Sequence, residues 1–228
     1  MPQTRSTAPD RIQQLAIRIR KHQRRLYAVG LLAVLAISGL FFFKRYQRQQ
    51  NDLAQREMFQ AVYYFEQEAF DKALHGDGVY VGLLDIAKTY RFTSAANLAH
   101  FYIGVSYLHQ KVYDKAIQHL TKFRSKDWLL PARAWALIGD AYAEQKDYKA
   151  AAAYYLKAAN YKPNKAFTPT YLVKAALAYE ANENRHAALG CYQRIVQKFP
   201  EVPQYGAAVK HVARLETLSK QPQQSPGH

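Results

Sequence analysis

The chain has 228 residues, which is enough for one medium-sized domain with appendages. Hydrophobic residues make up 49% of it, so a sizeable core can form, and Gly and Pro fall between apolar-periodic segments, as an all-helical protein requires. The single cysteine, Cys191, excludes an intramolecular disulfide framework and a cysteine-based zinc site.

The net charge of +15 is concentrated near the N-terminus. Residues 1–51 carry ten Lys and Arg against one acidic residue, Asp10, whereas residues 52–218 carry 21 Lys and Arg against 16 Asp and Glu. Because most of the excess flanks an apolar segment, the distribution indicates a membrane protein and argues against nucleic-acid binding.

Residues 1–25 form a basic N-terminal segment with two possible interpretations. Ile12, Leu15, Ala16 and Ile19 recur at helical spacing, which is typical of an amphipathic helix resting on anionic headgroups. A solvated basic tail would have the same composition, and the sequence does not decide between the two.

An uncharged stretch over residues 26–43 is predicted to be a transmembrane anchor. It reads LYAVGLLAVLAISGLFFF, and a helix of this length spans about 27 Å, enough for the hydrocarbon core. Basic pairs bracket both ends, which a buried core helix would not favour. A cleaved signal peptide is the alternative, with Ala36-Ile37-Ser38 as the cleavage site. The long preceding segment and the FFFKR that follows favour retention as an anchor.

The charges beside the anchor predict its orientation. Six basic residues lie on the N-terminal side and four on the C-terminal side: Arg11, Arg18, Arg20, Lys21, Arg24 and Arg25 against Lys44, Arg45, Arg48 and Arg56. The positive-inside rule then predicts a cytoplasmic N-terminus and an exported C-terminal domain.

A repeat of about 34 residues organises the rest of the chain. With Ala132 as position 1, large apolar residues occupy positions 4, 7, 11 and 24, small residues occupy 8, 20 and 27, and proline occupies 32. These positions are held by Trp135, Ile138, Tyr142, Tyr155, Gly139, Ala151, Ala158 and Pro163. The pattern resembles the tetratricopeptide repeat (TPR), a helix–turn–helix unit, so we predict an all-α TPR solenoid preceded by one transmembrane helix.

Three further units follow from the same frame. Position 1 falls at Asn97, at Pro169 and, in a degenerate first unit, at Ala54. The matching residues are Ile103, Gly104, Tyr107, Ala116 and Leu120; Leu172, Ala176, Tyr179, Ala188, Tyr192 and Pro200; and Tyr64, Phe70 and Ala73. His100, Phe123, Trp128 and Ile195 depart from the pattern.

These units predict the domain organisation. We expect a TPR array over residues 44–203, with an insertion at residues 76–78 followed by a helix over Val79–Tyr90. A capping helix over residues 204–218 and a disordered tail over residues 219–228 complete the chain. Because no Gly or Pro lies between Gly39 and Gly76, the anchor helix is expected to run uninterrupted into the first repeat helix, which would fix the array at one angle close to the bilayer.

The sequence contains no motif for catalysis, phosphate binding or metal binding. It lacks HExxH, GxSxG and a glycine-rich phosphate loop, and its eight His residues are scattered. We therefore predict a protein that is not an enzyme and that has no catalytic residues, no cofactor, no metal and no small-molecule substrate.

The concave face of the array is the predicted binding site. TPR groove positions 2, 5, 9, 12 and 13 select Met58, Val62, Phe65, Leu98, Phe101, Val105, Leu108, Arg133 and Asp140, together with His109, Glu144, Thr170, Val173 and Glu180. The first residues are apolar and favour a hydrophobic segment or a partner helix. A neighbouring helix or the insertion covering this stripe is the alternative. Apolar residues replace the Lys and Asn of carboxylate-clamp TPR domains, which disfavours a co-chaperone clamp.

Two segments resemble a known family. Residues 63–108 read YYFEQEAFDKALHGDGVYVGLLDIAKTYRFTSAANLAHFYIGVSYL, and residues 139–160 read GDAYAEQKDYKAAAAYYLKAAN. They are similar to the bacterial inner-membrane TPR family of ancillary SecYEG translocon subunits, with Gly76-Asp77-Gly78 as the most specific mark. The resemblance covers roughly residues 20–218.

The resemblance implies a scaffold in the bacterial inner membrane, anchored in lipid through residues 26–43. Its N-terminus would be cytoplasmic and its repeats periplasmic, and its partners would be translocon subunits, a periplasmic chaperone or nascent clients. A structural or assembly subunit of another membrane complex is the alternative, and a cytoplasmic co-chaperone would require the inverted topology.

Overall fold

The computed structural model describes residues 8–220, with side chains described from residue 27 to residue 219. It divides into two compact units, up to Gln50 and from Asn51 onward. The disordered tail predicted over residues 219–228 begins too early, because Ser219 and Lys220 belong to the last helix. Residues 221–228 lie outside the described part of the chain. The amphipathic face expected between Ile12 and Ile19 likewise concerns side chains outside it.

The first helix, α1 (Ala8–Glu66), is unbroken, in line with the lack of Gly and Pro between Gly39 and Gly76. Its part from Tyr27 onward is long and apolar enough to cross a membrane, and none of the apolar window is buried by the protein. Exposed apolar side chains over a full bilayer length are costly in water, so α1 is a candidate transmembrane span.

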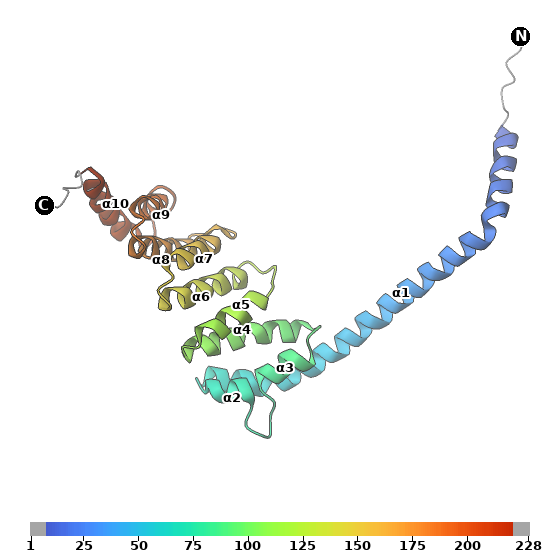
Figure 1. Cartoon of the computed structure of the whole chain (residues 1–228), viewed down its shortest axis with the longest axis horizontal. Coiled ribbons are helices and arrows are strands. Elements are labelled where there is room, and N and C mark those ends of the chain that lie inside the picture. Colours follow the sequence, from blue (N-terminus) through green and yellow to red (C-terminus); the bar gives the residue numbers. More distant parts are fainter. Residues whose placement is uncertain (1–7, 221–228) are drawn as a thin grey trace, which may run out of the picture. The chain divides into compact units, whose positions relative to one another are not determined.

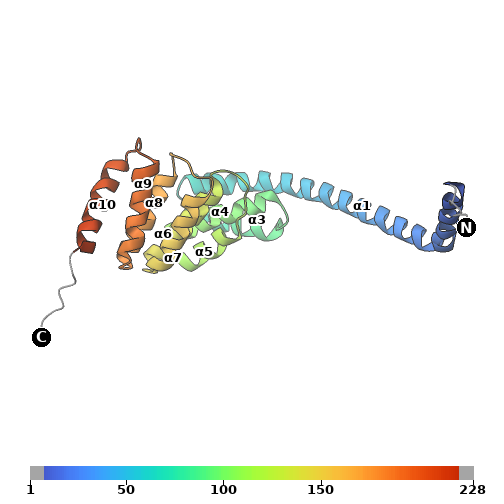
Figure 2. The ribbon, with the colours of Figure 1, turned by 90° about the horizontal axis from the view of Figure 1, so that it is seen from above.

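In the part of the second unit that the structure describes, nine further helices pack together with the last turns of α1. They are α2 (Phe70–His75), α3 (Leu83–Thr89), α4 (Ser94–His109), α5 (Tyr113–Lys122), α6 (Leu130–Glu144), α7 (Tyr148–Asn160), α8 (Thr168–Ala181), α9 (Arg185–Lys198) and α10 (Tyr205–Lys220). From α3 to α10 each helix packs on the one that follows it in the chain (Figures 1 and 2). The described residues contain no strand, only one isolated bridge between Gly76 and Val81.

The same turn reverses the chain within each helix pair. A residue with positive φ follows the first helix, at Glu68, Lys111, Lys146 and Glu183 (φ 57° to 62°). The backbone N–H of the next residue donates to the carbonyl five residues before it, at 2.8–2.9 Å. The donors are Ala69, Val112, Asp147 and Asn184, and the acceptors are Tyr64, Tyr107, Tyr142 and Tyr179. This six-to-one bond and the left-handed residue define a Schellman motif. Its recurrence at offsets of 43, 35 and 37 residues gives the first pair the same turn as the other three.

Small residues let the paired helices approach closely. Ala73, Ala116, Ala151 and Ala188 are fully buried at equivalent places in the second helices. Gly104 of α4 lies so near α5 that an added Cβ would be 2.5 Å from Leu120 Cγ, and at Gly139 of α6 it would be 2.7 Å from Tyr155 Cε1. The pairs can pack at this distance only with small side chains at these positions.

The predicted start of the helix over Val79–Tyr90 is wrong, because α3 begins four residues later, at Leu83. Asp77 accepts hydrogen bonds from the backbone N–H groups of Val79 and Tyr80 (3.0 and 2.8 Å), which ties the segment into a turn. Gly76 adopts φ +82° there, a conformation that favours glycine. The residues after Gly78 therefore form a tight loop instead of a first helical turn.

Replacing Gly104 by Ala is expected to destabilise the protein by about 1–3 kcal/mol, because the new methyl group overlaps Leu120 near the root of its side chain. Thermal unfolding of the detergent-solubilised chain, followed by circular dichroism, measures the change. Gly190→Ala in α9 is the matched control, since its Cβ meets nothing within 4 Å and helix propensity predicts a gain of roughly 0.5–1 kcal/mol. Equal effects of the two substitutions would contradict the close-approach argument.

Candidate protein-binding groove

An open groove of about 500 Å³ runs across the first helices of three successive pairs. Its lining residues come from α4, α6 and α8 and from the adjoining α5 and α7: Leu108, His109, Lys111, Tyr113, Asp140, Ala143, Glu144, Tyr155 and Lys174. The Schellman turn after α4 contributes Lys111 to the groove, α5 contributes Tyr113, and α8 of the last helix pair contributes Lys174.

Asp140 is the central polar group of this groove. Its Oδ1 accepts a hydrogen bond from Tyr155 Oη at 2.6 Å and forms an ion pair with Lys174 Nζ at 2.7 Å. Burial, and next the hydrogen bond to Asp140, raise the pKa of Tyr155, so this hydroxyl stays protonated and donates. Asp140 therefore joins α6 to α7 within one pair and to α8 of the next pair.

A second set of contacts joins α6 to the preceding pair. Tyr113 Oη of α5 lies 3.3 Å from a carboxylate oxygen of Glu144, and Gln145 Nε2 donates to Asp114 Oδ1 at 2.7 Å. These bonds cross between neighbouring units on the groove side, so the walls of the groove are held by polar contacts between units.

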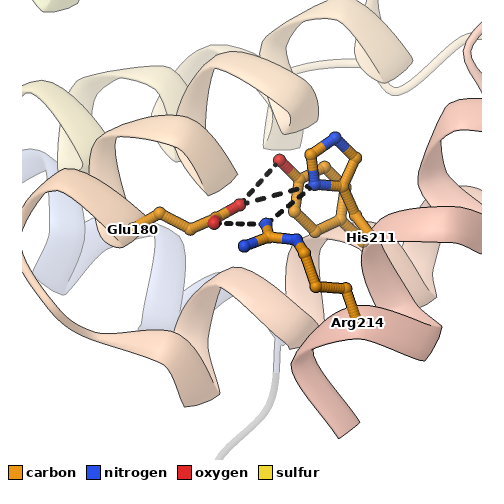
Figure 3. A network of polar contacts seen from close by, with 4 residues as sticks. Glu180, His211 and Arg214 are labelled. Atoms are coloured by element: carbon orange, nitrogen blue, oxygen red, sulfur yellow. Dashed lines mark hydrogen bonds and ion pairs between the residues drawn. The ribbon is translucent and has the colours of Figure 1, made fainter. Parts of the chain in front are cut away.

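Glu180 of α8 repeats the arrangement at the end of the array (Figure 3). Its carboxylate accepts from Tyr192 Oη at 3.0 Å and pairs with Arg214 of α10, while His211 Nδ1 lies 3.7 Å away. Arg214 follows Glu180 by 34 residues, as Lys174 follows Asp140. An acidic residue thus links each of these first helices to the tyrosine of its own pair and to a base on the next first helix.

The structure separates the predicted groove residues into four groups. Met58, Phe101 and Val105 are buried in the core, where they pack against neighbouring helices. Val62, Phe65 and Leu98 are half-buried beside them, and Arg133 is exposed but does not line the groove. Leu108 and Asp140 do line it, together with His109 and Glu144.

Five residues that line the groove were absent from the predicted set: Lys111, Tyr113, Ala143, Tyr155 and Lys174. Tyr155 was assigned only to the core, since position 24 is an apolar packing position. Lys174 falls at position 6 of the unit that begins at Pro169, which is not one of the groove positions used, so the pattern did not select it. Lys111 and Tyr113 had no sequence signal, since Lys111 belongs to a turn and Tyr113 begins the helix after it, and the repeat pattern does not describe how that turn is folded.

Comparison with known families agrees with this architecture. Residues 132–165 match a tetratricopeptide-repeat model, and residues 98–127 and 171–201 match a second tetratricopeptide-repeat model. The chain contains tetratricopeptide repeats. The first match begins at Ala132, the position 1 chosen from the sequence, so the predicted all-α TPR fold is confirmed. No curated protein matches the chain.

TPR domains are generally protein-interaction scaffolds and not catalysts. Among the described residues, no group of three or more His, Cys, Asp or Glu could hold a metal ion. The Cys191 thiol is buried, and burial raises its pKa to about 11, so it is not a thiolate at neutral pH. The polar groups of the groove are suited to hydrogen bonding with a polypeptide.

A histidine pair lies inside the second TPR. His100 Nδ1 of α4 and His119 Nδ1 of α5 are 3.0 Å apart, and both side chains are part-buried. Burial lowers the pKa of His119 to about 4, and the neighbouring charges of His100, Lys122 and Lys115 contribute to the shift. Burial, and next the charge of Lys122, lower the pKa of His100. The pair is therefore neutral at pH 7, with one ring donating to the other.

The TPR array is expected to lose stability as the pH falls from about 6.5 towards 4. The folded pair binds fewer protons than the unfolded chain in this window, so acid favours unfolding. After allowance for partial solvent exposure, the loss between pH 7.5 and pH 5 is about 1–2 kcal/mol. Urea unfolding at the two pH values measures it.

His119→Gln should reduce this pH dependence, whereas the matched variant His186→Gln, at an exposed site in α9, should leave it unchanged. An equal pH slope in the wild type and in His119→Gln would assign the acid sensitivity to other groups.

Proposed function

We propose that this protein is an inner-membrane scaffold whose periplasmic TPR groove receives nascent or folding proteins, or a chaperone that attends them, beside the Sec translocon. The groove between Lys111 and Lys174 is the observation that carries the proposal, since it is open and lined by donors and acceptors from several units. The apolar span in α1 supports the membrane setting. The resemblance of residues 63–108 and 139–160 to ancillary translocon subunits supports the Sec setting.

The groove favours an extended polypeptide over a compact ligand. It crosses three TPRs, and its exposed groups include an ammonium at Lys111, a carboxylate at Glu144 and an imidazole at His109. Leu108 and Ala143 supply apolar surface between these polar groups. A chain with alternating polar and apolar side chains would satisfy both, and its peptide groups would find donors and acceptors along the walls.

A second candidate function rests on α1. Leu53, Phe59 and Tyr63 of its repeat segment are exposed, and Phe59 exposes 75% of its surface. An apolar face on the terminal helix of an array suits a permanent partner, so a structural or assembly subunit of another membrane complex is the rival function. Purification in mild detergent separates the two candidates, because a stoichiometric complex without translocon subunits would favour the second.

The topology is expected to be N-terminus in and TPR domain out. Because Cys191 is buried and its thiol is protonated, a single introduced cysteine reports its own exposure. In spheroplasts a membrane-impermeant maleimide should label Ala207→Cys, at an exposed site in α10, but should label Ser6→Cys only after lysis. The reverse labelling pattern would place the TPR domain in the cytoplasm and defeat the proposed function.

A photoreactive amino acid at Glu144, an exposed groove position, is expected to cross-link exported polypeptides or periplasmic folding factors in living cells. The same amino acid at Ala153, exposed on α7 outside the groove, is the matched control and should give at least severalfold less product. Identification of the cross-linked proteins by mass spectrometry is the measurement. Equal capture at both positions, or capture of cytosolic proteins alone, would contradict the proposal.

A further inference from the structure

A second cavity, of about 300 Å³, lies between α5, α6 and α7 and shares no lining residue with the groove. Buried apolar side chains form part of its lining, among them Phe123, Ala134 and Ile138. Two half-buried aromatic rings, Trp135 of α6 and Tyr154 of α7, also line it. An apolar and aromatic interior of this kind stabilises a hydrophobic group that enters from water.

The rim of this cavity is positively charged. Arg124 follows α5, and Lys157 of α7 places its ammonium 4.5 Å from the centre of the Trp135 ring. No Asp or Glu is among the described residues that line the cavity. Asp127, which precedes α6, is not among these lining residues, and its carboxylate accepts hydrogen bonds from the backbone N–H groups of Leu129 and Leu130. The rim is therefore complementary to an anion.

The size of the cavity limits its occupant to about one side chain. Pockets for whole small molecules range from about 300 to 1,000 Å³, and this cavity is at the bottom of that range. A long acyl chain needs a deeper apolar channel, while a ring of phenylalanine size can rest against Trp135 and Tyr154. The exposed hydroxyl of Thr121 and the half-buried hydroxyl of Ser125 add hydrogen-bonding groups where a peptide backbone would pass.

We propose that this cavity binds an aromatic side chain of a partner polypeptide that carries Asp or Glu beside it. The ring enters the cavity, and the carboxylate pairs with Lys157. Arg124, whose Nη1 donates to the carbonyls of Thr121 and Phe123, adds positive charge beside this pair. This contact lies outside the groove of the proposed function and gives the array a second docking surface, which recognises acidic-aromatic segments.

Tryptophan fluorescence of the full chain tests the proposal. The chain has two tryptophans, so Trp128→Phe leaves Trp135 in the cavity wall as the sole reporter. The protein is kept soluble in amphipol, which contains no tryptophan, and is titrated with the blocked peptide Ser-Glu-Phe-Glu-Ser. We expect a saturable change in Trp135 emission. The peptide with Lys in place of both Glu residues, and the one with Ser in place of Phe, should each bind at least fivefold more weakly.

Charge variants assign the binding to this rim. Lys157→Gln should weaken binding of the acidic peptide about fivefold, the change expected for loss of one charge-assisted contact. Lys149→Gln, an exposed site on the same helix, is the matched control and should bind as the parent does. Lys157→Glu should reverse the preference in favour of the lysine peptide.

Three results would overturn the proposal: equal affinity for the acidic and lysine peptides, unchanged affinity in Lys157→Gln, or a Trp135 response to laurate with none to the acidic peptide. The last would make the cavity a fatty-acid site. Cross-linking at Glu144 is independent of this cavity, so failure here leaves the groove proposal standing, and failure of cross-linking leaves this one standing.

Discussion

The close approach of two helices at a small residue is the constraint on which the array depends. At Gly104 and Gly139 no side chain separates the helices, and Leu120 and Tyr155 fill the space that a Cβ would occupy. The Schellman turn then has to return the chain at a fixed distance, which explains why Lys111 and Lys146 adopt positive φ although neither is glycine. The cost of that backbone conformation is offset by helix packing that recurs in each unit.

Polar contacts connect the units that this packing creates. Stacked repeats need contacts between neighbours, since a single pair cannot bury its apolar face alone. Here Asp140 and Glu180 each bond to a tyrosine of their own pair and to a base one repeat further on. A displaced unit would leave these part-buried carboxylates without their partners, which is costly, so the contacts favour one register of the stack.

The repeat pattern was enough to predict the fold, because positions 8, 11, 20 and 24 are dictated by helix packing that any unit must satisfy. It predicted less well which residues line the candidate groove. The sequence places Phe101 and Val105 at groove positions, but in this chain both are covered by neighbouring helices in the core. Whether a neighbour covers a side chain depends on tertiary contacts that no local spacing encodes. The loop after Gly78 was not predicted for a similar reason, because its shape depends on hydrogen bonds from the backbone to the Asp77 side chain.

The apolar residues predicted to line the groove are largely buried by neighbouring helices, and this changes what the groove can recognise. With Met58, Phe101 and Val105 buried, the groove that remains is mixed and polar, and its walls are already paired through Asp140 and Glu144. Such a surface gains little from burial of apolar area and discriminates by hydrogen bonds, which favours weak and reversible contact with many chains. The cavity beside Trp135 differs from the groove, since buried apolar residues and two aromatic rings form part of its lining. In our proposal they hold one aromatic side chain, and the cations at the rim select the residue next to it. A scaffold with both surfaces would hold one defined partner at the cavity and leave the groove free for changing ones.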